Sequence, residues 1–350
     1  MNILITGGAG FIGSAFIRNI AKDKGNVVVN VDKLTYASNL SSLESLQGSD
    51  NYSFEEVDIC DYQSILKILN SYKIEAVINL AAETHVDRSI DDSSPFIKTN
   101  IVGTYTLLEA CCEYWKKLPV KVKSIFKFVH VSTDEVYGDM HGKKPCLETT
   151  PYSPSSPYSA SKAGSDHLVR AWYKTYGFPS IITNCTNNYG PYQFPEKLIP
   201  LTIYNAIEGK ELPLYGDGNQ MRDWLYVNDH VEALVIVLNK GVVGETYNIS
   251  SNEVNTNKNI VEKICEILSR IDGNKKAIDY FSLVRYVKDR PGHDVCYSLD
   301  SSKIRSQLGW KQKTPLINGL EETVKWYCNN NKNNVMSNYE RNRIGQLKED

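Results

Sequence analysis

The stretch Thr6-Gly7-Gly8-Ala9-Gly10-Phe11-Ile12-Gly13 decides the fold. It follows an apolar strand-like run, Asn2–Thr6, and opens a helical pattern, Gly13–Lys22. Its glycines permit a tight turn, a close approach of the backbone to a pyrophosphate, and tight packing of helix on strand. The first turn of the helix then offers free N–H groups and a positive dipole end to phosphates. The stretch therefore predicts a dinucleotide-binding site at the start of a βαβ unit.

An acidic residue stands at the distance that such a site requires. Asp32 follows the apolar run Val27–Val31 and lies 32 − 13 = 19 residues after Gly13. A carboxylate there accepts hydrogen bonds from a ribose diol and repels a 2′-phosphate, which favours NAD over NADP. Lys33 weakens that preference, because a cation can pair with a phosphate. The alternative, a glycine turn beside an ordinary strand-end acid, accounts less well for the whole context.

Outward from this unit, apolar runs alternate with helical patterns through the first half of the chain. The runs are apolar almost throughout, as in parallel strands that are covered on both faces. We therefore predict an α/β fold with a Rossmann-type, doubly wound parallel sheet. The strands are expected at Asn2–Thr6, Asn26–Val31, Tyr52–Val57, Ala76–Leu80, Lys127–Ser132 and Ser180–Asn184, and the helices at Gly13–Lys22, Ser64–Tyr72, Asn100–Lys116 and Ser159–Tyr176.

The pattern changes near Tyr189, where prolines and turn residues become frequent as far as Asp223. A strand and helix follow at Asp223–Asn239, with another strand at Glu245–Ile249 and a helix at Asn259–Ile271. This alternation predicts a smaller α/β substrate lobe that is interleaved with the first. We assign residues 1–188 and 224–256 to the NAD-binding domain, 189–223 and 257–328 to the substrate lobe, and 329–350 to a polar C-terminal tail.

Composition narrows the class of protein. The 350 residues include 39 Lys and Arg against 41 Asp and Glu, and a net charge of −2 argues against a nucleic-acid partner. No apolar run reaches the ~18 residues of a membrane span, and no leader pattern opens the chain. The eight cysteines have neither Cys-x-x-Cys pairing nor Cys/His metal spacing. We expect a cytoplasmic protein with no membrane partner and no metal.

A second motif lies within the predicted helix Ser159–Tyr176 and the residue before it. Tyr158 and Lys162 are four positions apart, so their side chains share one face. An ammonium beside a phenol favours the phenolate, and the pair can take a proton from an alcohol while a hydride leaves the same carbon. Alone, Tyr-x-x-x-Lys is more often an ordinary helix pair. The glycine motif upstream favours the catalytic interpretation of this pair.

The run Val129–Gly138 begins as a buried strand and turns polar at its carboxyl end, with Ser132, Thr133, Asp134 and Glu135 in succession. Ligands of open α/β sheets lie at that end of the strands. Two adjacent acids near a buried site are costly unless they are used. A turn with a helix cap explains Ser132 or Asp134 singly, but explains the whole run poorly.

Together these motifs resemble the extended short-chain dehydrogenase/reductase family of nucleotide-sugar-modifying enzymes. Within the family, the triplet at positions 133–135 resembles that of the dTDP-glucose 4,6-dehydratases, as do the segments 87–90, 187–198, 222–227 and 289–294. The similarity runs from the first residue to about Tyr327. Related 4-epimerases have small or hydroxylic residues in place of Asp134-Glu135, because they neither remove the C5 proton nor expel the C6 hydroxyl.

The resemblance implies a reaction that begins and ends with the same cofactor. Tyr158, assisted by Lys162, would deprotonate the glucose C4 hydroxyl as NAD⁺ takes the hydride, and Thr133 would bond the C4 oxygen. Glu135 would then remove the C5 proton while a protonated Asp134 donates to the leaving C6 hydroxyl. Return of the hydride to C6 gives a 4-keto-6-deoxy sugar, for deoxysugar biosynthesis such as that of rhamnose. Whether the nucleotide is dTDP or UDP stays open.

The resemblance also implies the binding residues. The cofactor set comprises Gly7, Gly10, Phe11, Ile12, Gly13, Asp32, Lys33, Leu34, Thr35, Asp58, Ile59, Leu80, Ala81, Ala82, Thr99, Tyr158, Lys162 and Asn188. The substrate set comprises Thr84, Thr133, Asn187, Lys197, Leu198, Pro213, Leu214, Tyr215, Arg222, Asn257, Asp289, Arg290 and His293. Arginines suit this second set because their planar guanidinium groups bind phosphate oxygens bidentately. His85, His130 and His230 are interpreted as structural.

The helical patterns Asn100–Lys116 and Ser159–Tyr176 are apolar on more than one side, which indicates burial on more than one side. Relatives dimerise through these two helices, so the resemblance implies a homodimer. The alternatives are a UDP-sugar 4,6-dehydratase, a 4-epimerase or decarboxylase of the same family, and a non-catalytic NAD-binding regulator. The acid pair argues against epimerase and decarboxylase, and the complete catalytic set argues against the regulator.

Overall fold

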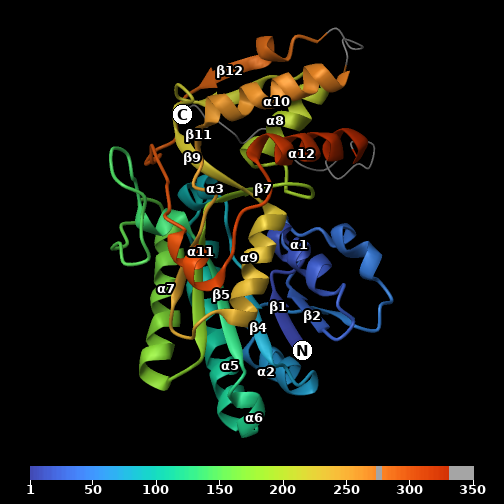
Figure 1. Ribbon diagram of the computed structural model, residues 1–350, viewed down its shortest axis with the longest axis vertical. Coiled ribbons are helices and arrows are strands. Elements are labelled where there is room, and N and C mark those ends of the chain that lie inside the picture. The colour runs from blue at the N-terminus through green and yellow to red at the C-terminus, as the bar shows by residue number, and fades with distance from the viewer. Residues whose placement is uncertain (273–277, 331–350) are drawn as a thin grey trace.

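The computed structural model describes residues 1–272 and 278–330 and has two lobes (Figure 1). The larger lobe contains a parallel seven-stranded sheet in the order β10-β6-β5-β4-β1-β2-β3. The order reverses beside β1, as it does in doubly wound sheets. The predicted Rossmann-type fold is therefore confirmed. The strands are β1 Asn2–Thr6, β2 Val27–Asp32, β3 Tyr52–Glu56, β4 Ala76–Asn79, β5 Lys127–Thr133, β6 Ser180–Cys185 and β10 Thr246–Ile249.

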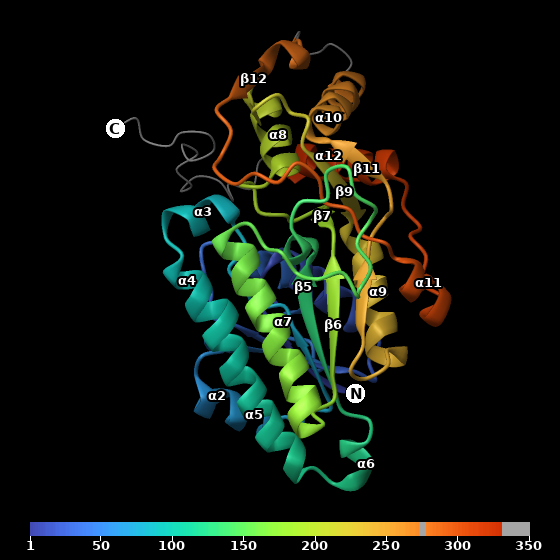
Figure 2. The ribbon, with the colours of Figure 1, turned by 90° about the vertical axis from the view of Figure 1, so that its left-hand side faces the viewer.

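Helices cover both faces of this sheet (Figure 2). On one face lie α1 (Phe11–Ile20), α9 (Val227–Lys240) and α11 (Ser302–Leu308), and on the other lie α2 (Tyr62–Ser71), α5 (Thr104–Lys117) and α7 (Pro157–Tyr176). Successive strand residues serve opposite faces, since Ile3 and Ile5 join the core under α1 while Leu4 joins the core under α5. The shorter elements are η1 Leu40–Leu46, α3 Val86–Asp91, α4 Ser94–Phe96, the π-helical η2 Ile97–Gly103, α6 Val120–Lys123 and η3 Asp134–Tyr137.

The smaller lobe, at the top of Figure 1, has a core of its own. Strands β11-β9-β7 form a three-stranded sheet, and β8 pairs with β12. Side chains such as Ile199, Leu214, Ile264 and Leu320 pack between these strands and the helices. The elements are β7 Asn187–Tyr189, α8 Leu198–Ile207, β8 Leu212–Tyr215, β9 Met221–Tyr226, β11 Val254–Thr256, α10 Asn257–Asp272, η4 Tyr280–Leu283, β12 Val284–Val287 and α12 Leu316–Asn330.

The cores of the two lobes suggest a change to the domain bounds that were expected from the sequence. Ile304, Leu308 and Trp310 pack in the core of the larger lobe, although residues 257–328 were assigned to the smaller one. We propose that residues 302–310 belong with the NAD-binding lobe, because α11 buries its apolar face against β10 and α9. Of the expected tail 329–350, residues 329 and 330 end α12 and the rest lies outside the described residues.

Across the described ranges, every helix is too short or too polar to cross a bilayer.

Candidate active site

A cavity of about 410 Å³ lies where the carboxyl ends of β1, β2, β4, β5 and β6 meet the smaller lobe. All of the residues predicted for catalysis line it. So do all of those predicted for cofactor and substrate binding except Leu34 and Asp289. The fold thus brings segments that are far apart in sequence into one cleft.

The glycine turn forms one wall of this cavity. Gly7 has a φ of 69°, and a Cβ on it would lie 2.7 Å from the backbone of Ala81. A Cβ on Gly13 would lie 2.2 Å from the Gly7 carbonyl oxygen. Helix α1 then starts at Phe11, and no side chain in the described part of the protein caps its first turn. The cavity therefore faces the uncapped N–H groups of a helix, which suit a phosphate.

Asp32 stands beside this turn and is 7% exposed. Its Oδ2 accepts from the Ala9 N–H at 3.0 Å, and its Oδ1 accepts from the Leu34 N–H and the Ser38 hydroxyl, each at 2.9 Å. Leu34 does not line the cavity, and its contribution is this backbone bond. These donors fix the carboxylate as a rigid acceptor.

The Lys33 ammonium group contacts two polar side chains of the protein. Its Nζ lies 3.5 Å from Asp58 Oδ2 and donates to Thr99 Oγ1 at 3.0 Å. The cation that weakened the preference for NAD is therefore partnered within the protein. Because Lys33 is already paired, it no longer argues against a preference for NAD over NADP.

Tyr158 and Lys162 lie on successive turns of α7, both nearly inaccessible to solvent. Lys162 Nζ donates to the Val131 carbonyl at 2.9 Å, at the end of β5. Burial lowers the pKa of Lys162 and, with the nearby charge of Glu135, raises the pKa of Tyr158 well above its usual value. A hydrogen bond from Thr133 acts in the opposite direction on Tyr158. A capping box at Ser156 and a proline, Pro157, in the first turn fix where helix α7 begins.

Asp134 and Glu135 begin the short η3 helix directly after β5. Within the described residues, Asp134 Oδ2 and Glu135 Oε2 are buried without a hydrogen-bond partner. Burial first, and then the charge of Glu135, raises the pKa of Asp134 well above its usual value. Burial also raises the pKa of Glu135, but Arg290, Arg222 and Lys197 oppose that shift. The two carboxyls are thus driven towards different protonation states.

Cations from the smaller lobe face these acids. Arg222 donates to the carbonyls of Met221, Val295 and Asp294 at 2.8, 3.3 and 2.9 Å, and stacks 4.3 Å from the centre of the Tyr297 ring. Lys197 Nζ donates to the Thr84 carbonyl at 2.9 Å. Backbone carbonyls hold these cations without neutralising them, so a positive field remains for an anion.

Asp289, which was expected to bind substrate, does not line the cavity. Its Oδ1 lies 2.6 Å from His293 Nδ1, and its Oδ2 accepts from Gln220 at 2.8 Å. Asp289 therefore orients His293, which does line the cavity. Several polar atoms of the predicted substrate residues are buried with no partner in the described part of the chain, namely Asn187 Oδ1, Asn257 Oδ1 and Arg290 Nε.

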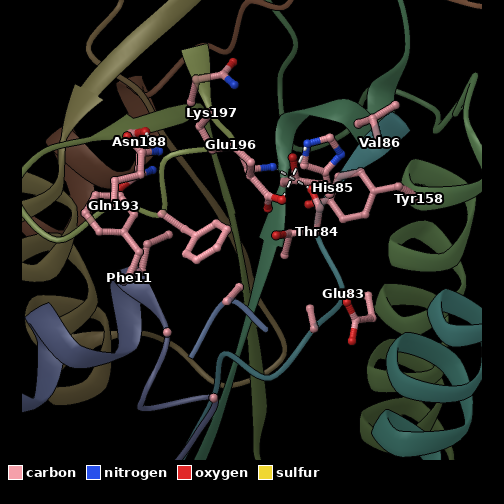
Figure 3. A pocket seen from close by; sticks show the side chains of 18 of the residues that line it. Phe11, Glu83, Thr84, His85, Val86, Tyr158, Asn188, Gln193, Glu196 and Lys197 are labelled. Carbon is pink, nitrogen blue, oxygen red and sulfur yellow. Dashed lines mark hydrogen bonds and ion pairs between the residues drawn. The ribbon is translucent and has the colours of Figure 1, made fainter. Parts of the chain in front are cut away.

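The cavity also contains residues that the sequence analysis missed. His85, which we interpreted as structural, lies with its Nε2 3.7 Å from Glu196 Oε2, and the two point towards each other in Figure 3. Tyr36 donates to the same carboxylate at 3.2 Å, and Arg88 lies 3.5 Å from it. Glu196 sits inside the segment 187–198 that carried the resemblance, and that segment was the available signal. Other missed lining residues include Glu83, Asp87, Gln193, Phe194 and Tyr297.

A parallel sheet that opens on this glycine turn defines a dinucleotide-binding protein, and the buried tyrosine–lysine pair of α7 places it among the extended short-chain dehydrogenase/reductases. The profile of the family described as GDP-mannose 4,6 dehydratase matches residues 4–323. The chain is 54% identical over 349 residues to the dTDP-glucose 4,6-dehydratase of Neisseria meningitidis serogroup B, with 98% of each chain covered. The chain belongs to this family and, within it, to the dTDP-glucose 4,6-dehydratases.

Solved structures agree with this assignment. The dTDP-glucose 4,6-dehydratase of Bacillus anthracis in complex with NAD is 44% identical, with a TM-score of 0.84 over 95% of this chain and 98% of that one. The corresponding enzyme of Streptomyces venezuelae, also crystallised with NAD, is 41% identical, with a TM-score of 0.87 over the same shares.

Proposed function

We propose that this protein is an NAD-dependent hydro-lyase that converts dTDP-glucose to dTDP-4-keto-6-deoxyglucose. The observation that carries the proposal is the adjacent buried acid pair Asp134 and Glu135, which lies beside Tyr158 and has oxygens without a hydrogen-bond partner among the described residues. A 4-epimerase needs only the tyrosine and the cofactor. An elimination across C5 and C6 also needs a base and an acid, and this site contains both.

The residues present fit NAD. The glycine cradle admits no Cβ at Gly7 or Gly13, the first turn of α1 is uncapped, and Asp32 offers a fixed carboxylate. When bound, NAD supplies a reversible hydride acceptor for the sugar. The residues that we expect to hold it are those of the cofactor set, with Leu34 acting through Asp32.

Tyr158 is the proposed base at the C4 hydroxyl. Its raised pKa makes the neutral phenol the resting form, so the phenol must lose its proton before it can act as a base, and a positive charge close by stabilises the resulting phenolate. Lys162, one turn further along α7, supplies that charge from a buried position. The Thr133 hydroxyl donates to Asp134 Oδ1 and accepts from the Glu135 N–H, and it can donate to the C4 oxygen by rotating away from Asp134.

The acid and base of the elimination follow from their surroundings. Burial and the neighbouring charge of Glu135 both raise the pKa of Asp134, so we assign Asp134 as the acid that donates to the leaving C6 hydroxyl. Glu135 faces Arg290, Arg222 and Lys197, which favour its ionised form, so it is the base at C5. The same cations, with Asn187, Asn257 and His293, bind the nucleotide diphosphate.

We also propose a homodimer through α5 and α7. Large apolar side chains gather on the outer surface of η2, α5 and α7: Ile97 is 45% exposed, Val102 45%, Tyr105 46% and Tyr176 47%. Tyr105 and Trp172 stack edge-to-face, which extends the patch from α5 to α7. Light scattering at micromolar concentration should give twice the chain mass, and Val102→Asp should give a monomer.

All eight cysteines are free thiols, which supports placement in the reducing cytoplasm.

The function is tested by incubating the protein with dTDP-glucose in deuterated water and following the sugar by NMR. A 4,6-dehydratase gives a 4-keto-6-deoxy product with solvent deuterium at C5. An epimerase leaves C5 untouched, and a non-catalytic NAD-binding regulator leaves the sugar unchanged. UDP-glucose in a parallel reaction identifies the nucleotide.

A further inference from the structure

One carboxylate of the larger lobe bonds two predicted substrate residues of the smaller lobe. Asp87, on α3, accepts from Arg290 NH1 at 2.9 Å and from the Tyr215 hydroxyl at 2.8 Å. Its two oxygens are thus used by partners that are 203 and 128 positions away. Asp87 itself lines the cavity and was absent from the predicted site.

This contact leaves the arginine ready for an anion. Arg290 and Asp87 each expose only 20% of their side chains, so their ion pair is largely shielded from water. Asp87 takes NH1, while Arg290 Nε is buried with no partner among the described residues. A guanidinium that is held at one nitrogen and has another donor unused can direct that donor to a phosphate oxygen.

The same short helix is tied to the catalytic helix. Ser89 Oγ, two residues after Asp87, accepts from the Tyr158 N–H at 3.3 Å. His85 caps α3, since its Nδ1 accepts from the Arg88 N–H at 3.4 Å. Helix α3 therefore connects the residue expected to hold the diphosphate with the residue expected to take the C4 proton.

We propose that Asp87 is a positioning residue for substrate: it orients Arg290 and Tyr215 towards the diphosphate and, through α3, sets their distance from Tyr158. The inference rests on the proposed function, because it assumes a nucleotide-sugar ligand in this half of the cavity. Asp87 acts through Arg290 and Tyr215, without contact to the reacting carbons. A sugar whose diphosphate is loosely held spends less time with its C4 hydroxyl at Tyr158.

The test compares Asp87→Asn with Asp91→Asn, a matched change at an exposed residue of the same helix. Asparagine keeps the size of the side chain but loses its charge. Binding of dTDP and dTMP to the NAD-loaded protein is measured by calorimetry, with UDP and UMP in parallel. We expect Asp87→Asn to weaken diphosphate binding about 10- to 100-fold and monophosphate binding much less, which corresponds to the loss of one charge-assisted anchor. Asp91→Asn should change neither.

Kinetics give a second measurement. Asp87→Asn should raise KM more than it lowers kcat, and Asp87→Glu should restore part of the loss. Adding Arg290→Lys to Asp87→Asn should cost little more than Arg290→Lys alone, because both changes remove one anchor. An unchanged ratio of diphosphate to monophosphate affinity, additive losses in this cycle, or loss of NAD or of the fold in Asp87→Asn would each overturn the proposal.

The binding measurement needs no turnover. A wild-type protein that binds dTDP but does not dehydrate dTDP-glucose would refute the proposed function and leave the test of Asp87 intact.

Discussion

The cofactor half of the cavity takes its main elements from the first 32 residues of the chain, whereas the substrate half collects residues between positions 84 and 293. In the cofactor half, Asp32 is bonded to its own neighbours, and the glycine turn is defined by close backbone contacts. In the substrate half, charges pair across the lobes, as Asp87 does with Arg290. A local motif builds the first half, and only the packing of two lobes builds the second.

The difference indicates how each half treats its ligand. Backbone N–H groups and a fixed carboxylate suit a cofactor that stays bound through each turnover. Side chains that are held by a partner across the lobes, as Arg290 is by Asp87, and that keep another donor unused among the described residues suit a ligand that must enter and leave. Asp134 and Glu135 lie on the border and serve neither binding task.

The largest expected effect comes from a change in the acid pair between the two halves of the cavity. Glu135→Gln removes the base at C5 and should lower product formation about 10³-fold, within the range for general acid–base groups. NAD content and dTDP affinity should stay within about threefold of wild type, because no binding contact is lost. Rates and C5 deuterium incorporation are followed by NMR, with the exposed Glu266→Gln as the control. Product formation at the wild-type rate in Glu135→Gln would contradict the assignment.

Gly13→Ala should damage the cofactor half alone. Its Cβ would lie 2.2 Å from the Gly7 carbonyl oxygen, so the turn must shift. Overpacking of this kind costs about 1–3 kcal/mol, which predicts an NAD affinity about 10- to 100-fold lower. Gly25→Ala is the control, because its Cβ meets only the flexible Asp23 side chain. NAD content after gel filtration is the measurement, and full occupancy in Gly13→Ala would count against the comparison.

Arg222→Lys should damage the substrate half alone. Lysine lacks the planar fork that bonds three carbonyls and stacks on Tyr297. We expect a KM for dTDP-glucose about tenfold higher with NAD content unchanged. Arg285→Lys, on an exposed ion pair of the same lobe, is the control. Loss of NAD in Arg222→Lys would show that the two halves are not separable.

The smallest expected effect concerns His230, which contacts Asn188 of the predicted cofactor set. His230 is fully buried, lies with its Nδ1 2.9 Å from Asn188 Oδ1, and has its pKa lowered to about 3 by burial. The unfolded chain binds a proton on this histidine near pH 6.5, while the folded protein does not until about pH 3. The free energy of unfolding should therefore fall as the pH drops through that window, by about 1.4 kcal/mol per pH unit for this group.

His230→Asn keeps a donor for Asn188 and removes the titrating ring. Denaturant unfolding at pH 7.5 and 5.5 should show a shallower loss of stability in the variant than in the wild type. Parallel pH dependences would mean that His230 does not contribute to acid sensitivity.

The sequence predicted the sheet well, because the expected limits of its first six strands nearly match the observed ones, although β3 is largely polar. It also predicted the glycine turn and Asp32, whose roles depend on local spacing. His85 and Glu196 were missed as site residues, since their proximity arises only when the segments 84–88 and 191–197 meet across the cleft. The proposed transfer of residues 302–310 to the larger lobe has the same origin, because no local feature of Ser302–Leu308 indicates which core it covers.

The chain passes between the two cores five times, after β6, β9, β10, β12 and α11. No single cut therefore separates a complete cofactor module from a complete substrate module. An exchange of the smaller lobe as one contiguous segment would therefore also exchange α9, β10 and α11, which pack in the core of the larger lobe. A chimera that exchanges the smaller lobe alone must therefore preserve five chain connections at once.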